Sequence, residues 1–259
     1  MAGKILDFYE ALADSYHLIF EDWESAIARQ AKILDSLLTL HGAGNPLKIL
    51  DCSCGIGTQA IGLAGMGHQV VASDLSEAAV RRAQREARQR GLTVSFYVSD
   101  MTSLKEIAES GFDVVISMDN ALPHLSTGQV VQAAAAIRRK LKPNGLFVAS
   151  IRDYDALIVE RPTMQKPAFF GAPGNRRIVH QVWDWTQNTG KDARYVLHLY
   201  ITIESERGWK AHHFVSEYRC LLRDELSAAL NQTGFADVRW IMQPESGFYI
   251  PVVVARLSA

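Results

Sequence analysis

The pattern of apolar and polar positions divides the chain into a helical beginning, an alternating middle and a strand-rich end. From residue 7 to 39, apolar side chains recur at helical spacing, which predicts helix with one apolar face. The segment His-Gly-Ala-Gly-Asn-Pro at 41–46 ends that pattern. Short β-rich runs then alternate with helical stretches up to residue 155, an order that predicts βαβ units and a parallel, doubly wound sheet.

Nine elements are expected in the alternating middle of the chain. Strands are expected at 47–50, 68–74, 93–100, 112–118 and 146–151. Helices are expected at 58–67, 76–91, 104–109 and 128–145.

After residue 155 the pattern changes to a strand-rich one. Prolines and glycines predict an irregular connection, which is followed by three β-rich runs at 176–186, 193–205 and 210–222. These runs predict an antiparallel three-stranded meander. A helix at 223–234 and two strands at 237–242 and 248–257 complete the chain. Because no helix separates the last two strands, they are expected to pair antiparallel.

Composition and charge favour a soluble enzyme with a small ligand. The 259 residues are 48% apolar and carry a formal charge of -1, so the chain can bury a large core and lacks the charge that attracts nucleic acid or a membrane surface. The first ten residues contain acids where a secretion signal would be apolar, and no run is long enough to cross a bilayer. A cytoplasmic location is expected.

The three cysteines do not predict a disulfide framework or a metal site. Cys52, Cys54 and Cys220 are odd in number and scattered, which suits a reducing compartment. A structural zinc site needs four ligands, whereas the C-x-C pair has no second pair, and His212 and His213 lie far along the chain. Small buried thiols beside a glycine turn are the expectation.

The stretch Leu-Asp-Cys-Ser-Cys-Gly-Ile-Gly-Thr at 50–58 predicts a glycine turn between a strand and a helix, where backbone can approach a ligand closely. Asp74 ends the next strand, which is compatible with a dinucleotide-binding fingerprint, but the third glycine of that fingerprint is absent. No Lys-Ser or Lys-Thr pair follows, which excludes a P-loop. Asp51 before the glycines and the final antiparallel strand pair favour S-adenosylmethionine over NAD.

On these motifs the sequence resembles the class I S-adenosylmethionine-dependent methyltransferases. That family's first motif is an acid followed by G-x-G-x-G, of which Ser53 replaces the first glycine here. The resemblance implies an α/β, doubly wound, Rossmann-like seven-stranded sheet whose last strand pair is antiparallel. It also implies that Asp74 binds the ribose hydroxyls of the cofactor and that Leu75, Asp100 and Met101 surround the adenine.

A closer resemblance, to the glycine and glycine/sarcosine N-methyltransferases, is carried by Ser-Ile-Arg-Asp-Tyr-Asp-Ala-Leu-Ile at 150–158, by Asn-Ala-Leu-Pro-His-Leu at 120–125 and by the N-terminal helix. It implies that Arg29 binds the methionyl carboxylate of the cofactor, while Arg152 and Asn120 hold the acceptor. Arg29 as a solvated helix residue and Arg152 paired with a neighbouring aspartate remain alternatives.

His124 is the candidate general base, as in the sugar-amine N-methyltransferases that this loop also resembles. Capping of the following helix is its alternative role. Tyr9 and Tyr16 are expected in a lid helix over the sulfonium, or in amphipathic packing. The cofactor-binding set implied by the resemblance is Tyr16, Arg29, Asp51, Ser53, Cys54, Gly55, Gly57, Asp74, Leu75, Asp100, Met101 and Met118.

The resulting hypothesis is transfer of a methyl group from S-adenosylmethionine to the nitrogen of a small amine, such as glycine or sarcosine, leaving S-adenosylhomocysteine. The expected parts are a helical lid (1–45), a cofactor-binding core (46–155), an antiparallel insertion on the acceptor side (156–222) and the end of the core (223–259). The glycine enzymes place tyrosines where this chain has Ile178, Val179 and His180. The resemblance therefore does not fix the identity of the methyl acceptor. An O- or C-methyltransferase, a nicotinamide dehydrogenase and a noncatalytic binding protein are the alternatives.

Overall fold

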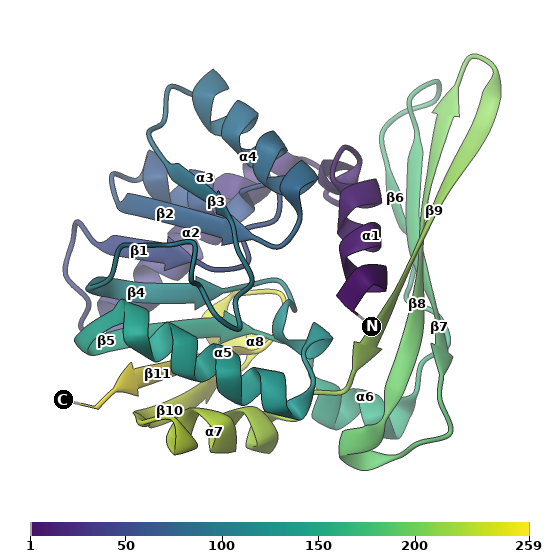
Figure 1. The fold of residues 1–259 in the computed structure, drawn as a ribbon. Helices are drawn as coiled ribbons and strands as arrows, with labels where there is room; N and C mark the ends of the chain where they lie inside the picture. Colours follow the sequence, from purple (N-terminus) through teal and green to yellow (C-terminus); the bar gives the residue numbers. More distant parts are fainter. Residues whose placement is uncertain (1, 259) are drawn as a thin grey trace.

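The computed structural model describes residues 2–258 and contains a seven-stranded sheet in the order β10-β11-β5-β4-β1-β2-β3. Strands β1 to β5 are mutually parallel, while β11 lies antiparallel between β5 and β10. This arrangement confirms the predicted sheet and its final antiparallel pair (Figure 1). The strands are β1 Lys48–Asp51, β2 Gln69–Asp74, β3 Ser95–Val98, β4 Phe112–Ser117, β5 Leu141–Ser150, β10 Phe235–Ile241 and β11 Val252–Leu257.

Helices cover both faces of this sheet, with α5 and α7 on one face and α2 and α3 on the other (Figure 1). The central strands β1 and β4 are almost continuously apolar and buried, as expected of a parallel sheet covered on both sides. The helices are α2 Trp23–Leu40, α3 Thr58–Gly65, α4 Glu77–Gln89, α5 Thr127–Lys140, α7 Arg223–Gln232 and the short α8 Gln243–Ser246.

The helical pattern predicted from 7 to 39 is divided in the structure. Helix α1 Ala2–Leu12 ends before the 3-10 turn η1 Tyr16–Ile19, and α2 begins after Asp22. The Asp22 carboxylate caps α2 by accepting a hydrogen bond from Ser25 N at 3.2 Å. Periodicity detects the helical faces but not this break, because the break depends on a cap and on contacts with α4.

The helix expected at 104–109 does not form. Leu104 has a φ of +50°, a left-handed backbone conformation that ends a right-handed helix. The Asp100 carboxylate instead holds a turn by accepting from Thr102 N at 2.8 Å. The segment continues as turns whose side chains Leu104 and Ile107 are buried.

A second, four-stranded antiparallel sheet has the order β6-β7-β8-β9. The three predicted strands correspond to β7 Arg177–Trp185, β8 Arg194–Ser205 and β9 Gly208–Arg219, and the short β6 Ala168–Phe170 adds an edge. Helix α6 Tyr154–Glu160 lies in the connection from the main sheet, and two more 3-10 turns complete the elements, η2 Leu122–His124 and η3 Gly190–Asp192.

Helix α1 lies between the two sheets, in contact with α4 on one side and β9 on the other (Figure 1). Its buried side chains Phe8 and Leu12 belong to a core cluster that also contains Trp183 and Tyr195 of the four-stranded sheet. One apolar core therefore runs from the main sheet through the helix to the meander. Within residues 2–258, no helix is both long enough and apolar enough to span a bilayer.

Candidate active site

A cavity of about 220 Å³ lies at the carboxyl ends of β1 to β4, with α1 and η1 along its rim. Ligands of doubly wound sheets bind at this edge because the strand-to-helix loops converge there. Eleven residues proposed from the sequence line the cavity: Tyr9, Tyr16, Ser53, Cys54, Gly55, Asp74, Leu75, Asp100, Met101, Met118 and His124. Asn120 and Arg152 lie outside its lining, and Arg29, Asp51 and Gly57 do as well.

The turn between β1 and α3 requires glycine at two positions. Gly55 and Gly57 have φ values of +52° and +94°. A Cβ on Gly57 would also lie 2.8 Å from the Ile61 Cδ1 atom, so that side chain would have to shift. Ser53 fits at the first position of the motif, where its hydroxyl lies 3.0 Å from the Ser117 hydroxyl. The departure from G-x-G-x-G therefore leaves the turn intact.

The carboxylate of Asp74 lies at the cavity with backbone donors around it. Gly55 N donates to one oxygen at 2.8 Å and Ser76 N to the other at 2.9 Å. Burial raises the pKa of this carboxyl group even though those hydrogen bonds oppose the shift. Asp100, at the end of β3, is exposed at the cavity rim. Two carboxylates thus offer free acceptor positions at the ends of adjacent strands, an arrangement suited to ligand hydroxyl groups.

The Asp51 carboxylate supports the turn between β1 and α3 and does not line the cavity. Its side chain is fully buried, with one oxygen accepting from Ser53 N at 3.2 Å and the other without a hydrogen-bond partner. Burial raises the pKa of this carboxyl group to about 8. The cofactor-binding role proposed for Asp51 is therefore limited to supporting the turn.

Arg29 does not reach the cavity, which corrects the role proposed for it. The buried face of α2 includes Ala26, Ile27 and Gln30, while Arg29 lies on the exposed face. Gln30 Oε1 instead accepts from Gln59 Nε2 at 2.6 Å. Adjacent residues of a helix point about 100° apart, so a one-residue error in register exchanges a cavity-side position for a solvated one.

Arg152 has only neutral partners. Its guanidinium donates to Tyr195 Oη at 2.8 Å and to Gln181 Oε1 at 3.1 Å, and it lies 4.7 Å from the centre of the Trp183 ring. The alternative pairing with a neighbouring aspartate is wrong, because Asp153 and Asp155 pair with Arg223. Among the residues that the structure describes, Arg152 has no carboxylate within 4.0 Å.

Asn120 fixes the backbone next to that guanidinium. Its buried side-chain oxygen accepts from Arg152 N at 3.0 Å, and its amide donates to Tyr154 Oη at 3.0 Å. The Tyr154 and Tyr195 hydroxyls are 3.2 Å apart, which continues the chain of hydrogen bonds to the guanidinium. Asn120 and Arg152 are thus brought together, as the resemblance implied, although the oxygen and the nitrogen of the Asn120 side-chain amide already form hydrogen bonds within the protein.

His124 forms a cluster with two tyrosines. Its Nε2 atom is 2.9 Å from the Tyr9 hydroxyl, and its ring lies 4.1 Å from the ring of Tyr218, measured between centres. Burial lowers the pKa of His124 to about 4, so the imidazole is neutral at pH 7. The alternative role as a helix cap is wrong, because Ser126 caps α5 through a capping box with Gln129.

Sequence patterns did not reveal several residues around the cavity. Gln59 and Asp119 line it, and the Tyr249 hydroxyl donates to Asp119 at 2.8 Å from a position 130 residues further along the chain. Tyr218 reaches the site from β9. These positions depend on tertiary packing, so no local pattern could identify them.

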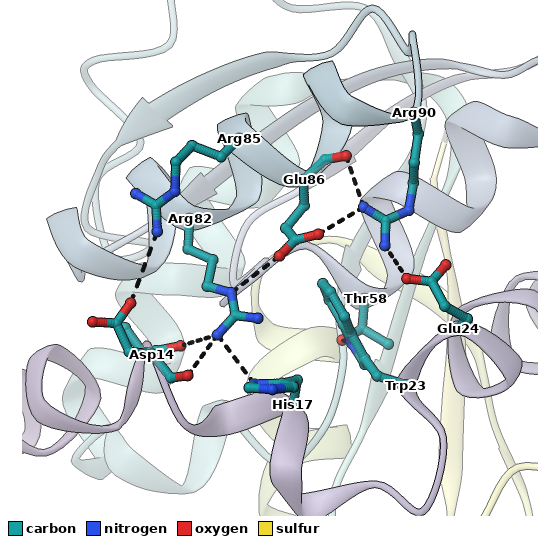
Figure 2. Close-up of polar contacts among 10 residues, drawn as sticks. Asp14, His17, Trp23, Glu24, Thr58, Arg82, Arg85, Glu86 and Arg90 are labelled. Carbon is teal, nitrogen blue, oxygen red and sulfur yellow. Dashed lines mark hydrogen bonds and ion pairs between the residues drawn. The ribbon is translucent and has the colours of Figure 1, made fainter.

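Helix α4 holds the N-terminal segment against the cavity. Figure 2 shows Arg82 pointing from α4 to the turn between α1 and η1, where it donates to Ala13 O at 3.2 Å, to Asp14 O at 2.7 Å and to His17 Nδ1 at 3.1 Å. The Glu10 carboxylate of α1 accepts from Ser76 Oγ at 2.8 Å at the start of α4. These contacts fix Tyr9 and Tyr16 at the cavity rim.

Residues 49–145 match the family described as "Methyltransferase domain". A glycine/sarcosine N-methyltransferase of Parasynechococcus marenigrum is 29% identical over 153 residues, 59% of this chain and 53% of that protein. A ubiquinone biosynthesis O-methyltransferase of Roseobacter denitrificans is 36% identical over 104 residues, 40% of each chain. The chain spans about half the length of the curated relatives it matches.

Among solved structures, the amino pentose methyltransferase CalS10 of Micromonospora echinaspora, with S-adenosylmethionine bound, superposes with a TM-score of 0.72 over 95% of both chains at 17% identity. At that identity the likeness concerns the fold alone. The fold, the cavity at the strand ends and the match over residues 49–145 together support a class I S-adenosylmethionine-dependent methyltransferase.

The residues at the cavity fit the cofactor of this class. Gly55 lines the cavity without a side chain, so its backbone can approach the ligand, and the carboxylate of Asp74 can accept from ribose hydroxyls while that of Asp100 can accept from the adenine. None of the ion pairs within 4.0 Å among residues 2–258 includes Asp51, Asp74 or Asp119. The carboxylates of Asp74 and Asp119 at the cavity match the positive charge of a sulfonium nucleoside, whereas Asp51, with its pKa raised to about 8, is mostly neutral at pH 7.

Proposed function

We propose that this protein transfers a methyl group from S-adenosylmethionine to the nitrogen of a small amine that carries a carboxylate. One observation supports the acceptor class most directly. The Arg152 guanidinium is surrounded by neutral acceptors and aromatic rings, with no acidic partner within 4.0 Å in the described part of the chain. A partly buried cation without a counter-ion favours an anionic ligand. The glycine/sarcosine N-methyltransferase relative is named for acceptors of this kind.

On the cofactor side, the glycine turn and the carboxylates of Asp74 and Asp100 would hold the nucleoside, and Leu75 and Met101 would pack beside its base. When bound, S-adenosylmethionine supplies the methyl group on a positively charged sulfur. The neutral thioether S-adenosylhomocysteine would be a good leaving group, so the protein must mainly align the acceptor and exclude water. Such alignment contributes up to roughly 7–11 kcal/mol in model reactions.

On the acceptor side, Arg152 would bind the carboxylate through two of the planar N–H donors that Tyr195 and Gln181 leave free, a geometry that fixes orientation as well as position. Asn120 holds the Arg152 backbone, and Trp183 and Tyr218 flank the guanidinium at 4.7 and 5.7 Å. These rings exclude water from the charged contact. The Tyr9 and Tyr16 side chains at the cavity rim would cover the reacting atoms.

His124 suits an amine acceptor better than a hydroxyl acceptor. With its pKa lowered to about 4, the imidazole is too weak a base to deprotonate an alcohol appreciably. An amine can lose its proton to water before it enters and then needs no base. His124 would accept a hydrogen bond from Tyr9 or from the acceptor, and this role disfavours the O-methyltransferase alternative.

Two measurements test the proposal. S-adenosylhomocysteine should bind in a calorimetric titration and raise the melting temperature in a thermal melt, whereas NAD should do neither. Glycine, sarcosine, dimethylglycine and larger amines, each paired with its decarboxylated analogue, should then be screened for methyl acceptance. The carboxylated member of a pair is expected to be the better acceptor. Binding of NAD in place of S-adenosylhomocysteine, or equal activity with the decarboxylated analogues, would contradict the proposal.

A further inference from the structure

The Asp119 carboxylate lines the cavity on the opposite side of the glycine turn from Asp74 and Asp100. Asp119 follows β4, which flanks β1 on one side, whereas Asp74 and Asp100 follow β2 and β3 on the other. A nucleoside bound through its ribose at Asp74 therefore has its sugar and base on the β2–β3 side. A substituent on the 5′ carbon can extend across the turn toward Asp119.

Each oxygen of Asp119 has one neutral donor. Tyr249 Oη donates to Oδ1 at 2.8 Å, and Gln59 Nε2 donates to Oδ2 at 2.8 Å. No Lys, Arg or His nitrogen lies within 4.0 Å of this carboxylate among residues 2–258. Because an ionised carboxylate can accept about four hydrogen bonds, two positions remain for a cationic donor.

The backbone at Asp119 is held in an unusual conformation that aims this side chain. Asp119 and Asn120 have φ values of +56° and +68°, two consecutive left-handed residues that are not glycine. Asp119 N donates to Ser150 Oγ at 2.8 Å and Asn120 N donates to Ser150 O at 3.1 Å, so β5 fixes the turn. Such strained positions persist where the surrounding structure requires them, often at ligand sites.

We propose that Asp119, positioned by Tyr249 and Gln59, binds the α-ammonium group of the methionine part of the cofactor. This inference rests on the proposed function, since it assigns one contact of the same cavity. Arg29 lies on the exposed face of α2 and does not line the cavity, whereas the Asp119 carboxylate lines it and can form an ion pair with the ammonium of the methionine part.

The amine of an acceptor is the other ammonium that Asp119 could contact, but the chemistry favours the cofactor. The acceptor nitrogen reacts through its lone pair and must be neutral, and a neighbouring carboxylate would stabilise the unreactive protonated form. The α-ammonium of the cofactor stays protonated throughout the reaction. A fixed carboxylate there strengthens cofactor binding at no cost to the acceptor.

The test compares S-adenosylhomocysteine with 5′-deoxy-5′-(3-carboxypropylthio)adenosine, which lacks the ammonium group but keeps the carboxylate. Calorimetry should show that the wild-type protein binds S-adenosylhomocysteine about tenfold to a hundredfold more tightly than this analogue. Asp119→Asn should remove most of that preference, with the analogue bound nearly as in wild type. Asparagine tolerates the left-handed backbone, so the variant is expected to fold.

A second variant protects the test against a folding defect. Tyr249→Phe removes one hydrogen bond to Asp119 from an exposed side chain and should reduce the preference severalfold without loss of the carboxylate. Equal weakening of both nucleosides in Asp119→Asn would overturn the inference, and so would an increase in acceptor KM with the nucleoside preference unchanged. If the wild-type protein binds neither nucleoside, the proposed function itself fails, and the inference with it.

Discussion

At the scale of single residues, a substitution of Arg152 should distinguish binding of the acceptor from binding of the cofactor. Arg152→Ala should raise the acceptor KM on the order of a hundredfold, because truncating one partner of a buried charge pair typically costs about 2–5 kcal/mol. Affinity for S-adenosylhomocysteine should change less than about twofold, because Arg152 lies outside the cavity lining that holds the proposed cofactor residues. Steady-state kinetics and calorimetry measure the two effects separately.

Arg223→Ala is the matched control for that experiment. Arg223 pairs with Asp153 and Asp155 beside the same loop but does not contact Arg152. The control should leave both parameters within about twofold, since exposed ion pairs contribute at most about 1 kcal/mol. Equal losses of acceptor and cofactor binding in Arg152→Ala would contradict its assignment to the acceptor.

Asp51 provides a prediction about pH at the same scale. Its pKa is about 8 in the folded protein and close to that of a free aspartate, about 4, in the unfolded chain. Between those values the folded state retains a proton that the unfolded state has lost, so the free energy of unfolding falls as the pH rises. Asp51→Asn should therefore stabilise the ligand-free protein at pH 8 by on the order of 2 kcal/mol, roughly 4–8 °C in melting temperature. The difference should disappear near pH 4.

Asp113→Asn serves as a control of opposite sign for the Asp51 experiment. Burial raises the pKa of Asp113, but its contacts with Lys142 and with Lys48 N outweigh that effect and leave the pKa lowered. This variant should be less stable than wild type at neutral pH, with the difference fading as the carboxyl group protonates. Thermal melts across pH 4–8 would contradict the Asp51 prediction if both variants shifted in the same direction.

Some site residues could be predicted from the sequence and others could not, for a physical reason. Gly55, Gly57 and Asp74 belong to a local motif in which the turn itself demands the residue types, and all three were identified. The register of Arg29 depends on which face of α2 meets α3, and periodicity alone did not fix it to within one residue. The role of Asp119 depends on Tyr249, 130 residues away, which leaves no local signal.

At the scale of elements, Arg82 makes a testable connection between α4 and the N-terminal segment. Arg82→Ala removes two hydrogen bonds to the turn between α1 and η1 and one to His17 of η1, and should cost about 2–3 kcal/mol of stability. Hydrogen exchange in α1 should become faster, and S-adenosylhomocysteine should bind several times more weakly. A loss of stability with unchanged exchange in α1 would contradict this role.

Arg85→Ala is the matched control on the same helix (Figure 2). Arg85 is more than half exposed and lies 3.8 Å from the Asp14 carboxylate, so its removal should change stability by less than about 0.5 kcal/mol. An equal effect of both variants would indicate that general helix stability, and not the Arg82 contacts, holds the segment.

Helices and strands were predictable where the apolar periodicity is strong. They were less predictable where tertiary contacts determine the secondary structure. The alternating strands and helices of the core correspond to β1 to β5 with α3, α4 and α5. The division between α1 and α2 depends on the Asp22 cap and on Arg82, and the three residues of β6 are too short for a periodic signal.

At the scale of the whole molecule, the segment formed by α1 and η1 joins the two sides of the site. Arg82 of α4 holds it from the cofactor side, and Arg177 of β7 holds it from the acceptor side by donating to Phe20 O at 2.6 Å. The apolar side chains of α1 pack in one core with both sheets. Ordering of this segment by one ligand should therefore lower the cost of ordering it for the other.

Cofactor and acceptor are accordingly expected to bind cooperatively. An acceptor identified by the methylation screen should bind about fivefold or more tightly to protein saturated with S-adenosylhomocysteine than to ligand-free protein, and by linkage the acceptor should tighten S-adenosylhomocysteine binding by the same factor. Calorimetry in both orders of addition measures these two factors. Arg82→Ala should reduce the cooperativity more than it reduces binding of the acceptor alone, because it frees the shared segment on one side. If the two ligands bind independently in the wild-type protein, the α1–η1 segment does not couple the two halves of the site.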